Sequence, residues 1–186
     1  MRDLNLFRVE GSVYLKNVNR KIDVVKSDDC DGYLIEASEK EARRIIESLK
    51  GSGKKIGVIG GDDAFNRRVV ESLKVDYLVS PERGLKFDNL KQRDSGINHV
   101  VAKLARDKGI SFVVDFSEIA GLKAVDRIAR IERIIQNVKI CRKAGCGIKI
   151  ASLGFSKKSV VDKKGREAFG VSLGMSSRQS FDSVRF

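Results

Sequence analysis

Short apolar runs alternate with longer amphipathic stretches along this chain. The runs are rich in β-branched residues and are flanked by Gly, Asp or Ser, which is typical of parallel strands buried on both faces. The segments expected to form strands are 3–7, 32–37, 55–60, 76–80, 111–116 and 148–154. A strand that is followed by a helix and then by another strand predicts right-handed crossovers and a parallel sheet covered by helices.

Local signals set the ends of the first two expected helices. Ser38 and Glu41 have the spacing of a capping box before an apolar stripe, and Gly51 follows that stripe where a left-handed C-cap belongs. Asp62 or Asp63 is expected to open the next helix, since a short acidic side chain accepts hydrogen bonds from free backbone N–H groups. We therefore expect helices directly after the second and third strands.

Two more helices are expected in the second half of the chain. Asp94 or Ser95 is expected to cap the first of them and Gly109 to end it. Its apolar stripe is Ile97, Val100, Val101, Leu104 and Ala105. Residues 122–143 read as one long helix. Its inward positions are expected to be Val125, Ile128, Ile135 and Val138, and its outward cations Arg127, Arg130, Arg133, Lys139 and Arg142.

Six or seven such units within 186 residues favour one closed domain over an open sheet. We expect an α/β fold, a TIM-barrel-like (β/α) barrel that occupies residues 1–186 as a single domain. Polar residues at strand ends would then meet at the C-terminal rim, where barrel enzymes carry their active sites. These rim positions are Glu36, Ser80, Asp115, Ser117 and Ser152.

The net charge and its distribution along the chain bear on the kind of partner that the protein binds. The formal net charge is +12, and residues 83–186 carry 22 Lys and Arg against 10 Asp and Glu, whereas residues 1–82 carry 15 of each. A basic half of this kind indicates nucleic acid or another polyanion, although a solvated basic surface is the alternative. No apolar run is long enough to span a bilayer and the first ten residues lack a signal-peptide pattern, so we expect a cytoplasmic protein without a membrane partner.

Candidate metal and redox chemistry is sparse. Three cysteines without paired spacing are expected to be reduced thiols that serve packing, and a single histidine is too few for a hydrolase metal centre. A magnesium site made of carboxylates stays open as an alternative, although isolated acids at strand ends more often cap helices or form ion pairs. The acids concerned are Asp3, Glu36, Asp62, Asp115 and Glu118.

The single histidine lies on a basic helix face. His99 shares this face with Lys103 and Arg106, so the three side chains form either a contact to phosphate or base, or an ordinary solvated surface. The segment "GCGIKIASLGFSKKS" offers a second place for anions, because Lys157 and Lys158 follow a strand end.

Three segments carry a resemblance to a known family. The stretches "DYLVSPE", "RDSGINHVVAKLARDKGI" and "AFGVSLGM" (169–175 at its core) resemble protein component 3 of archaeal ribonuclease P, the family that includes the eukaryotic 30-kDa subunit. The resemblance extends over most of the chain. It implies a barrel related to the polymerase and histidinol phosphatase (PHP) phosphoesterases, without their metal-binding histidines.

The resemblance also implies a role in the removal of 5′ leaders from precursor tRNA. In that family the RNA subunit cuts, with magnesium, so this chain would bind no cofactor and would act as a non-catalytic part of the holoenzyme. Its partners would be ribonuclease P RNA, protein component 2 and, indirectly, precursor tRNA. The expected RNA-binding residues are Arg83, Arg93, His99, Lys103, Arg106, Lys149, Lys157 and Arg166. The alternative is a metal-dependent, phosphoesterase-like barrel enzyme that acts on a small phosphorylated substrate through Asp115, Glu118 and Lys149.

Overall fold

A parallel sheet that curls into a barrel forms the centre of the molecule. The computed structural model describes residues 3–24, 29–84, 88–89 and 92–186. Within them seven strands pair in chain order, each parallel to the next. The strands are β1 Leu4–Asn5, β2 Val13–Val18, β3 Gly32–Ile35, β4 Lys55–Ile59, β5 Tyr77–Val79, β6 Ser111–Asp115 and β7 Ile148–Ala151.

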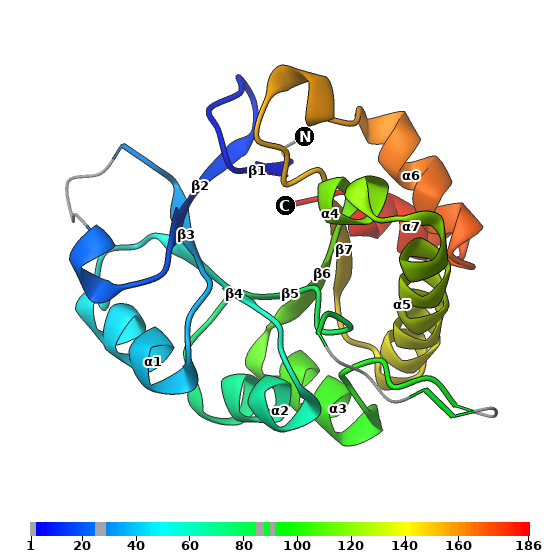
Figure 1. Ribbon diagram of the computed structural model, residues 1–186, viewed down its shortest axis with the longest axis horizontal. Coiled ribbons are helices and arrows are strands. Elements are labelled where there is room, and N and C mark those ends of the chain that lie inside the picture. Colours follow the sequence, from blue (N-terminus) through cyan, green and yellow to red (C-terminus); the bar gives the residue numbers. More distant parts are fainter. Residues whose placement is uncertain (1–2, 25–28, 85–87, 90–91) are drawn as a thin grey trace.

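Backbone hydrogen bonds nearly close the barrel between its first and last strands. The amide of Leu153, just past β7, donates to the Leu4 carbonyl at 2.9 Å, and the amide of Leu6 donates to the Gly154 carbonyl at 3.1 Å. Figure 1 accordingly shows β1 beside the end of β7. The expected TIM-like α/β barrel is therefore confirmed, in a nearly closed seven-stranded form.

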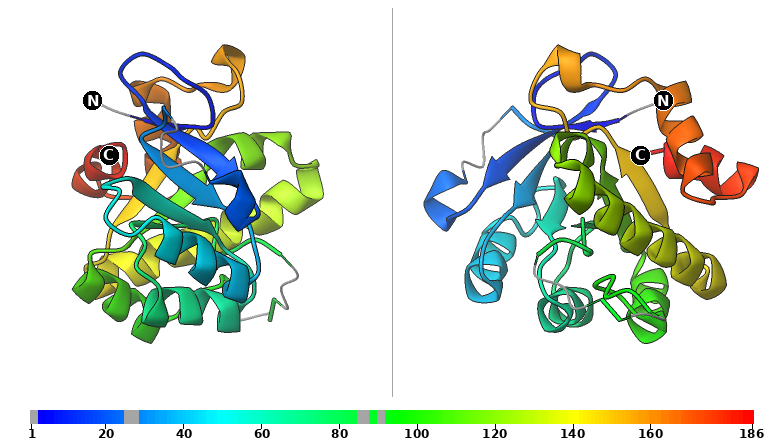
Figure 2. Two further views of the ribbon diagram at one scale, coloured as in Figure 1. Left: turned by 90° about the vertical axis from the view of Figure 1, so that its left-hand side faces the viewer. Right: turned by 45° about the vertical axis from the view of Figure 1, so that its right-hand side comes forward.

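Helices surround the outside of the barrel from β3 onward (Figures 1 and 2). They are α1 Glu39–Ser48, α2 Asp63–Ser72, α3 His99–Lys108, α4 Phe116–Gly121, α5 Ala124–Ala144, α6 Lys163–Ser172 and α7 Ser177–Ser183, with 3-10 turns Lys21–Asp23 and Lys157–Ser159. One core cluster lies between sheet and helices, and a smaller one, which includes Leu15, Leu34 and Val113, contains the alternate side chains of the same strands. No helix among the described residues is long and apolar enough to cross a membrane.

The second strand was missed by the sequence analysis. In β2, Val13 and Leu15 join the smaller core cluster, whereas Tyr14 and Lys16 are only half-buried. The short turn Lys21–Asp23 follows β2 in place of a helix. Because one face of β2 has no helix packed on it, its residues alternate instead of forming the continuous apolar run that marks the other strands.

The capping predictions hold in part. Asp62 caps α2 by accepting from the Phe65 amide at 2.6 Å, and Gly109 ends α3 in the left-handed conformation. Ser38 is the N-cap residue of α1, but its side chain makes no cap hydrogen bond, so the capping box was wrong. The carboxylate of Glu41 accepts instead from the Lys21 amide at 3.0 Å.

Helix α3 begins later than expected. Asn98, and neither Asp94 nor Ser95, caps it by accepting from two backbone amides at 3.0 Å each. The preceding residues lie against α5, where the side-chain amide of Asn137 donates to the Ser95 carbonyl at 2.9 Å. The shifted start leaves Val100 exposed to solvent rather than in the apolar stripe.

The long second-half helix is broken and rotated relative to the prediction. Residues 122 and 123 are extended and separate α4 from α5. Val125 and Ile128, expected to face inward, are 79% and 61% exposed, whereas Arg130, expected outward, is buried. Arg127 turns back to donate to three carbonyls in the last residues of α4 and the residue that follows it. The contacts of Arg127 and of the buried Arg130 thus help to set the helix phase together with the apolar residues.

Candidate nucleic-acid interface

A chain of ion pairs occupies the C-terminal end of the barrel. The Arg130 guanidinium lies 3.3 Å from the carboxylate of Glu118 and 3.9 Å from that of Glu82. Arg83 bridges Glu118 at 3.2 Å and Glu36 at 2.8 Å. These side chains come from the ends of β3 and β5 and from α4 and α5, so the barrel brings together residues that are far apart in sequence.

The loop after β5 is tightly held where it enters this cluster. The Asn66 side-chain amide donates to the Pro81 carbonyl at 2.8 Å and to the Gly96 carbonyl at 2.9 Å. Gly96 has a φ of 80°, and a Cβ at this position would lie 1.7 Å from the Pro81 oxygen, so only glycine fits. Residues 85–87 and 90–91, between β5 and α3, lie outside the described part of the chain.

The acids at the barrel end do not fit a metal site. Guanidinium groups stand among their carboxylates, where a divalent cation would have to lie, and Asp115 instead caps α4 by accepting from the Glu118 amide at 2.9 Å. Asp3 pairs with Arg166 and Asp62 caps α2. Across the described ranges no group of three or more His, Cys, Asp or Glu is placed to hold a metal ion.

Two of these carboxyl groups are difficult to ionise. Burial raises the pKa of Glu82 to about 7, although the nearby Arg130 charge opposes the shift. Burial also raises the pKa of Asp115 to about 7, against the hydrogen bond from the Glu118 amide. Glu82 is 1% exposed, and its Oε1 atom and the Nη1 atom of Arg130 make no hydrogen bond. Near neutral pH the carboxyl groups of Glu82 and Asp115 are therefore partly protonated in the folded protein, whereas the same groups would be ionised if they were exposed to water.

These raised pKa values predict that the folded state loses stability as the pH rises. Each group binds its proton more tightly folded than unfolded, so its stabilising contribution is complete below about pH 4 and is lost as the pH passes about 7. The loss is roughly 1.4 kcal/mol for each unit by which a pKa is raised. Urea unfolding at pH 5.5, 7 and 8.5 would measure it. We expect Glu82→Gln to flatten the profile and Glu10→Gln, at an exposed position, to leave it unchanged; an unaltered profile in Glu82→Gln would contradict this prediction.

Two of the predicted RNA-binding residues are engaged within the protein. Arg166 is 3% exposed, and its Nη1 atom contacts Asp3 at 2.9 Å and donates to the Ile150 carbonyl at 3.0 Å. Lys149 is half-buried and donates to the Asp182 carbonyl at 2.8 Å. The interior position of Arg166 removes it from the candidate surface, because its charge is needed by a buried carboxylate.

Three other predicted arginines have acidic partners in the structure. Arg83 belongs to the ion-pair cluster described above. Arg93 contacts Glu132 on α5 at 2.6 Å, and Arg106 contacts Asp107 at 2.8 Å and donates to the Ala144 carbonyl at 3.0 Å. A phosphate group that binds any of these three would have to share them with a carboxylate.

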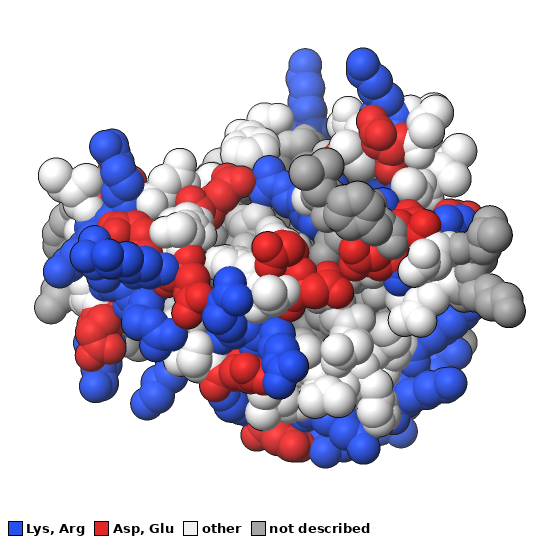
Figure 3. All heavy atoms as spheres, turned by 60° about the horizontal axis from the view of Figure 1, so that its bottom comes forward, with Lys and Arg blue, Asp and Glu red and all other residues white. Residues whose placement is uncertain are grey.

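The last three predicted residues are exposed but are not brought together. His99 and Lys103 lie on α3, whereas Lys157 lies in the loop between β7 and α6. Figures 1 and 2 show α3 and this loop on opposite sides of the barrel. Figure 3 shows basic and acidic side chains interspersed over one face, so on that face the excess charge does not form an unbroken basic surface.

The loop between β7 and α6 contains a residue that the sequence analysis missed. Phe155 is 74% exposed, and Lys157 and Lys158 beside it are exposed as well. We call residues 155–158 the rim loop. The sequence signal that could have identified it is an isolated aromatic residue that follows a glycine and precedes two lysines shortly after a strand.

The rim loop is anchored on both sides. Leu153 turns the chain with a φ of 44°, which is uncommon for a residue with a side chain, and the Gly154 amide donates to the Asn5 side chain at 3.3 Å. The Ser159 hydroxyl donates to the Ser156 carbonyl at 2.8 Å. The exposed aromatic ring is thus carried on a backbone whose position is already fixed.

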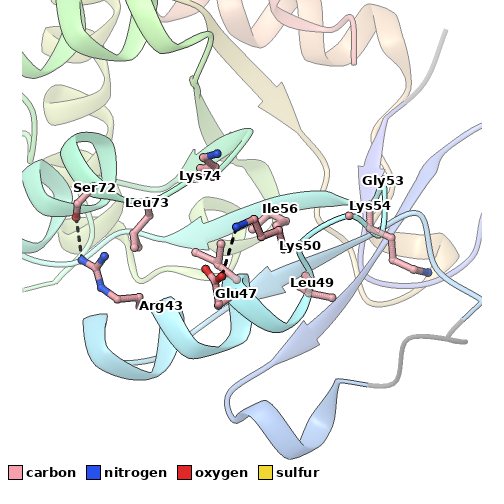
Figure 4. Close-up of a pocket in the computed structure, with 12 residues that line it drawn as sticks. Arg43, Glu47, Leu49, Lys50, Gly53, Lys54, Ile56, Ser72, Leu73 and Lys74 are labelled. Atoms are coloured by element: carbon pink, nitrogen blue, oxygen red, sulfur yellow. Dashed lines mark hydrogen bonds and ion pairs between the residues drawn. The ribbon is translucent and has the colours of Figure 1, made fainter.

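Of the residues of the enzyme alternative, Lys149 does not join Asp115 and Glu118. In the register of β6 and β7, Lys149 lies opposite Val113, two positions before Asp115, and its amine is bound to α7. A pocket of about 350 Å³ lies elsewhere, between the end of α1 and the start of β4 (Figure 4). This is the N-terminal end of the sheet, opposite to the C-terminal end where barrel enzymes carry their active sites. In Figure 4, Lys50 is paired with Glu47.

Comparison with known proteins reveals similarity to one family. No model of a known protein family matches the chain. Ribonuclease P protein component 3 of Methanococcus maripaludis is 26% identical over 164 residues, which are 82% of this chain and 68% of the relative. The same component of Methanocaldococcus jannaschii is 26% identical over 132 residues, 71% of this chain and 54% of the relative.

Solved structures show the fold. A chain in a cryo-EM structure of archaeal ribonuclease P with mature tRNA superimposes with a TM-score of 0.73 at 20% identity, covering 97% of this chain and 85% of that one. An amidohydrolase crystal structure superimposes with a TM-score of 0.58 at 15% identity, covering 84% of this chain and 41% of that one. Both carry the barrel architecture.

Proposed function

We propose that this chain is a member of the ribonuclease P protein component 3 family and a protein subunit of ribonuclease P that binds the catalytic RNA and supports removal of 5′ leaders from precursor tRNA. The observation that carries the proposal is the similarity over 82% of the chain to a protein of that name. Residues 1–186 would act as one domain.

The ion-pair cluster supports a non-catalytic role for the chain within the complex. Its carboxylates pair with Arg83 and Arg130, and burial raises the pKa of Glu82 to about 7, so these acids are poorly suited to bind a divalent cation. The magnesium of the reaction would then be bound by the RNA. Cleavage would require the assembled enzyme.

We place the centre of the RNA contact at the rim loop. Its two lysines can bind phosphates without breaking an ion pair described for them, and the ring of Phe155 presents a face on which an unpaired base can stack. His99 and Lys103 on α3 would form a separate, weaker contact. Protein component 2 is the proposed protein partner, precursor tRNA the indirect one and the cytoplasm the proposed compartment.

Affinity purification from the source cells tests this function. We expect the chain to retain a single structured RNA and the retained complex to cleave precursor tRNA in magnesium. Nuclease digestion of the RNA should abolish cleavage, and the recombinant chain alone should not cleave, because its described residues form no group of metal ligands. A preparation without a discrete RNA, or cleavage by the RNA-free chain that is lost in Asp115→Ala, would refute the proposal.

A further inference from the structure

The end of helix α5 brings two cysteines into contact. The helix ends in the sequence Cys141-Arg-Lys-Ala-Gly-Cys146, with Gly145 in the left-handed conformation at φ 72°. The amides of Gly145 and Cys146 both donate to the Cys141 carbonyl, at 2.8 and 3.1 Å. In a helix end of this kind the side chains of the first and sixth residues pack against each other. Here both of these side chains are thiols, and each lies near enough to shift the pKa of the other.

The two thiols differ in their access to solvent. Cys141 is fully buried in the core, whereas Cys146 is 9% exposed. Both line a pocket of about 470 Å³ between the end of α5, the start of β7 and α7. From this pocket Cys146 is therefore the more accessible of the two cysteines.

The charges around the pair favour the same order of reaction. Arg106, which donates to the Ala144 carbonyl, places a positive charge near Cys146. The interaction with the Cys141 thiol and this charge lower the pKa of the Cys146 thiol, while the interaction with Cys146 and burial raise the pKa of the Cys141 thiol. A thiolate is the attacking species in disulfide exchange, so Cys146 is the more reactive group.

We propose that Cys141 and Cys146 form a reversible dithiol–disulfide pair that reacts with small-molecule disulfides, with Cys146 as the attacking and Cys141 as the resolving cysteine. The Cys146 thiolate forms a bond to one sulfur of the small disulfide and releases the other half as a thiolate. Cys141 then loses its proton, bonds to the Cys146 sulfur and displaces the second half. The protein dithiol is oxidised by two electrons, and the small disulfide is reduced to two thiols.

The pair is independent of the proposed RNA function, since neither cysteine belongs to the rim loop or to the ion-pair cluster. It also differs from Cys30, whose sulfur lies 3.6 Å from the amine of Lys54 and which has no thiol partner among the described residues. The tests below therefore use the full chain with Cys30→Ser, so that only the pair can react.

Oxidised glutathione is the probe, and trapping with iodoacetamide followed by peptide mass spectrometry is the readout. We expect a Cys141–Cys146 disulfide that a dithiol reductant reverses, with little mixed disulfide accumulating. Cys141→Ser, or Cys141→Ala if the serine variant does not fold, should instead accumulate glutathione on Cys146. Cys146→Ser should leave Cys141 unmodified.

The role of Arg106 provides a second readout. We expect Arg106→Gln to shift the pH dependence of the reaction rate to higher pH, and Arg106→Lys to restore most of the wild-type profile, because the charge rather than the guanidinium shape lowers the thiol pKa. Stable glutathione adducts in the protein that has both cysteines, or faster modification of Cys141 than of Cys146, would overturn the proposal.

Discussion

Replacing Arg166 with alanine is expected to lower the free energy of unfolding by about 3–5 kcal/mol, the cost of leaving one member of a buried ion pair without its partner. The carboxylate of Asp3 would remain buried without a cation, and the Ile150 carbonyl would lose a donor. These contacts join β1, β7 and α6, so the loss affects the region where the barrel closes. Urea denaturation followed by circular dichroism measures the change.

Two further variants separate the ion pair from a general effect of mutating α6. Lys164→Ala, at an exposed position two residues earlier, should change stability by no more than about 0.5 kcal/mol. The double variant Asp3→Asn with Arg166→Met should be more stable than Arg166→Met alone, since no unpaired charge then remains buried. A stability of Arg166→Ala within about 1 kcal/mol of the wild type would show that the pair does not hold the barrel together.

Removal of the two rim-loop lysines is expected to have the largest effect on RNA binding. Lys157→Ala with Lys158→Ala should weaken binding to ribonuclease P RNA and reduce the slope of log affinity against log salt by roughly 1.5, since each lost phosphate contact contributes about 0.7–0.9. Phe155→Ala should weaken binding by about 1–3 kcal/mol for a stacked base and leave the slope unchanged. Filter binding at several salt concentrations distinguishes the two effects.

A matched loss of charge elsewhere provides the control. Lys40→Ala with Lys74→Ala removes two exposed lysines from α1 and from the turn after α2, and it should reduce affinity less than the rim-loop pair does. Thermal melting of each variant should match the wild type, because all four lysines are exposed. Equal losses of affinity and slope in both pairs would mean that net charge, and not the rim loop, carries the binding.

The candidate site was only partly predictable, because a charged residue gives no local signal of its burial. Arg166 and Lys157 look alike in sequence, since each lies in a basic, polar stretch after β7. Asp3, the buried carboxylate with which Arg166 forms an ion pair, lies near the opposite end of the chain. Arg130 was likewise predicted to face outward, and the acids that it contacts come from other strand ends.

The sequence by itself determined the order of most strands and helices and the barrel class. Strands buried on both faces need continuous apolar runs, and helix ends need particular capping residues, so Asp62 and Gly109 could be identified from their neighbours alone. Only the tertiary structure decided which cations face solvent, that Phe155 stands exposed and that Glu82 is buried beside Arg130. The reason is physical: local hydrogen bonds and periodicity act within a few residues, whereas burial and ion pairing depend on side chains that the closed barrel brings from distant positions.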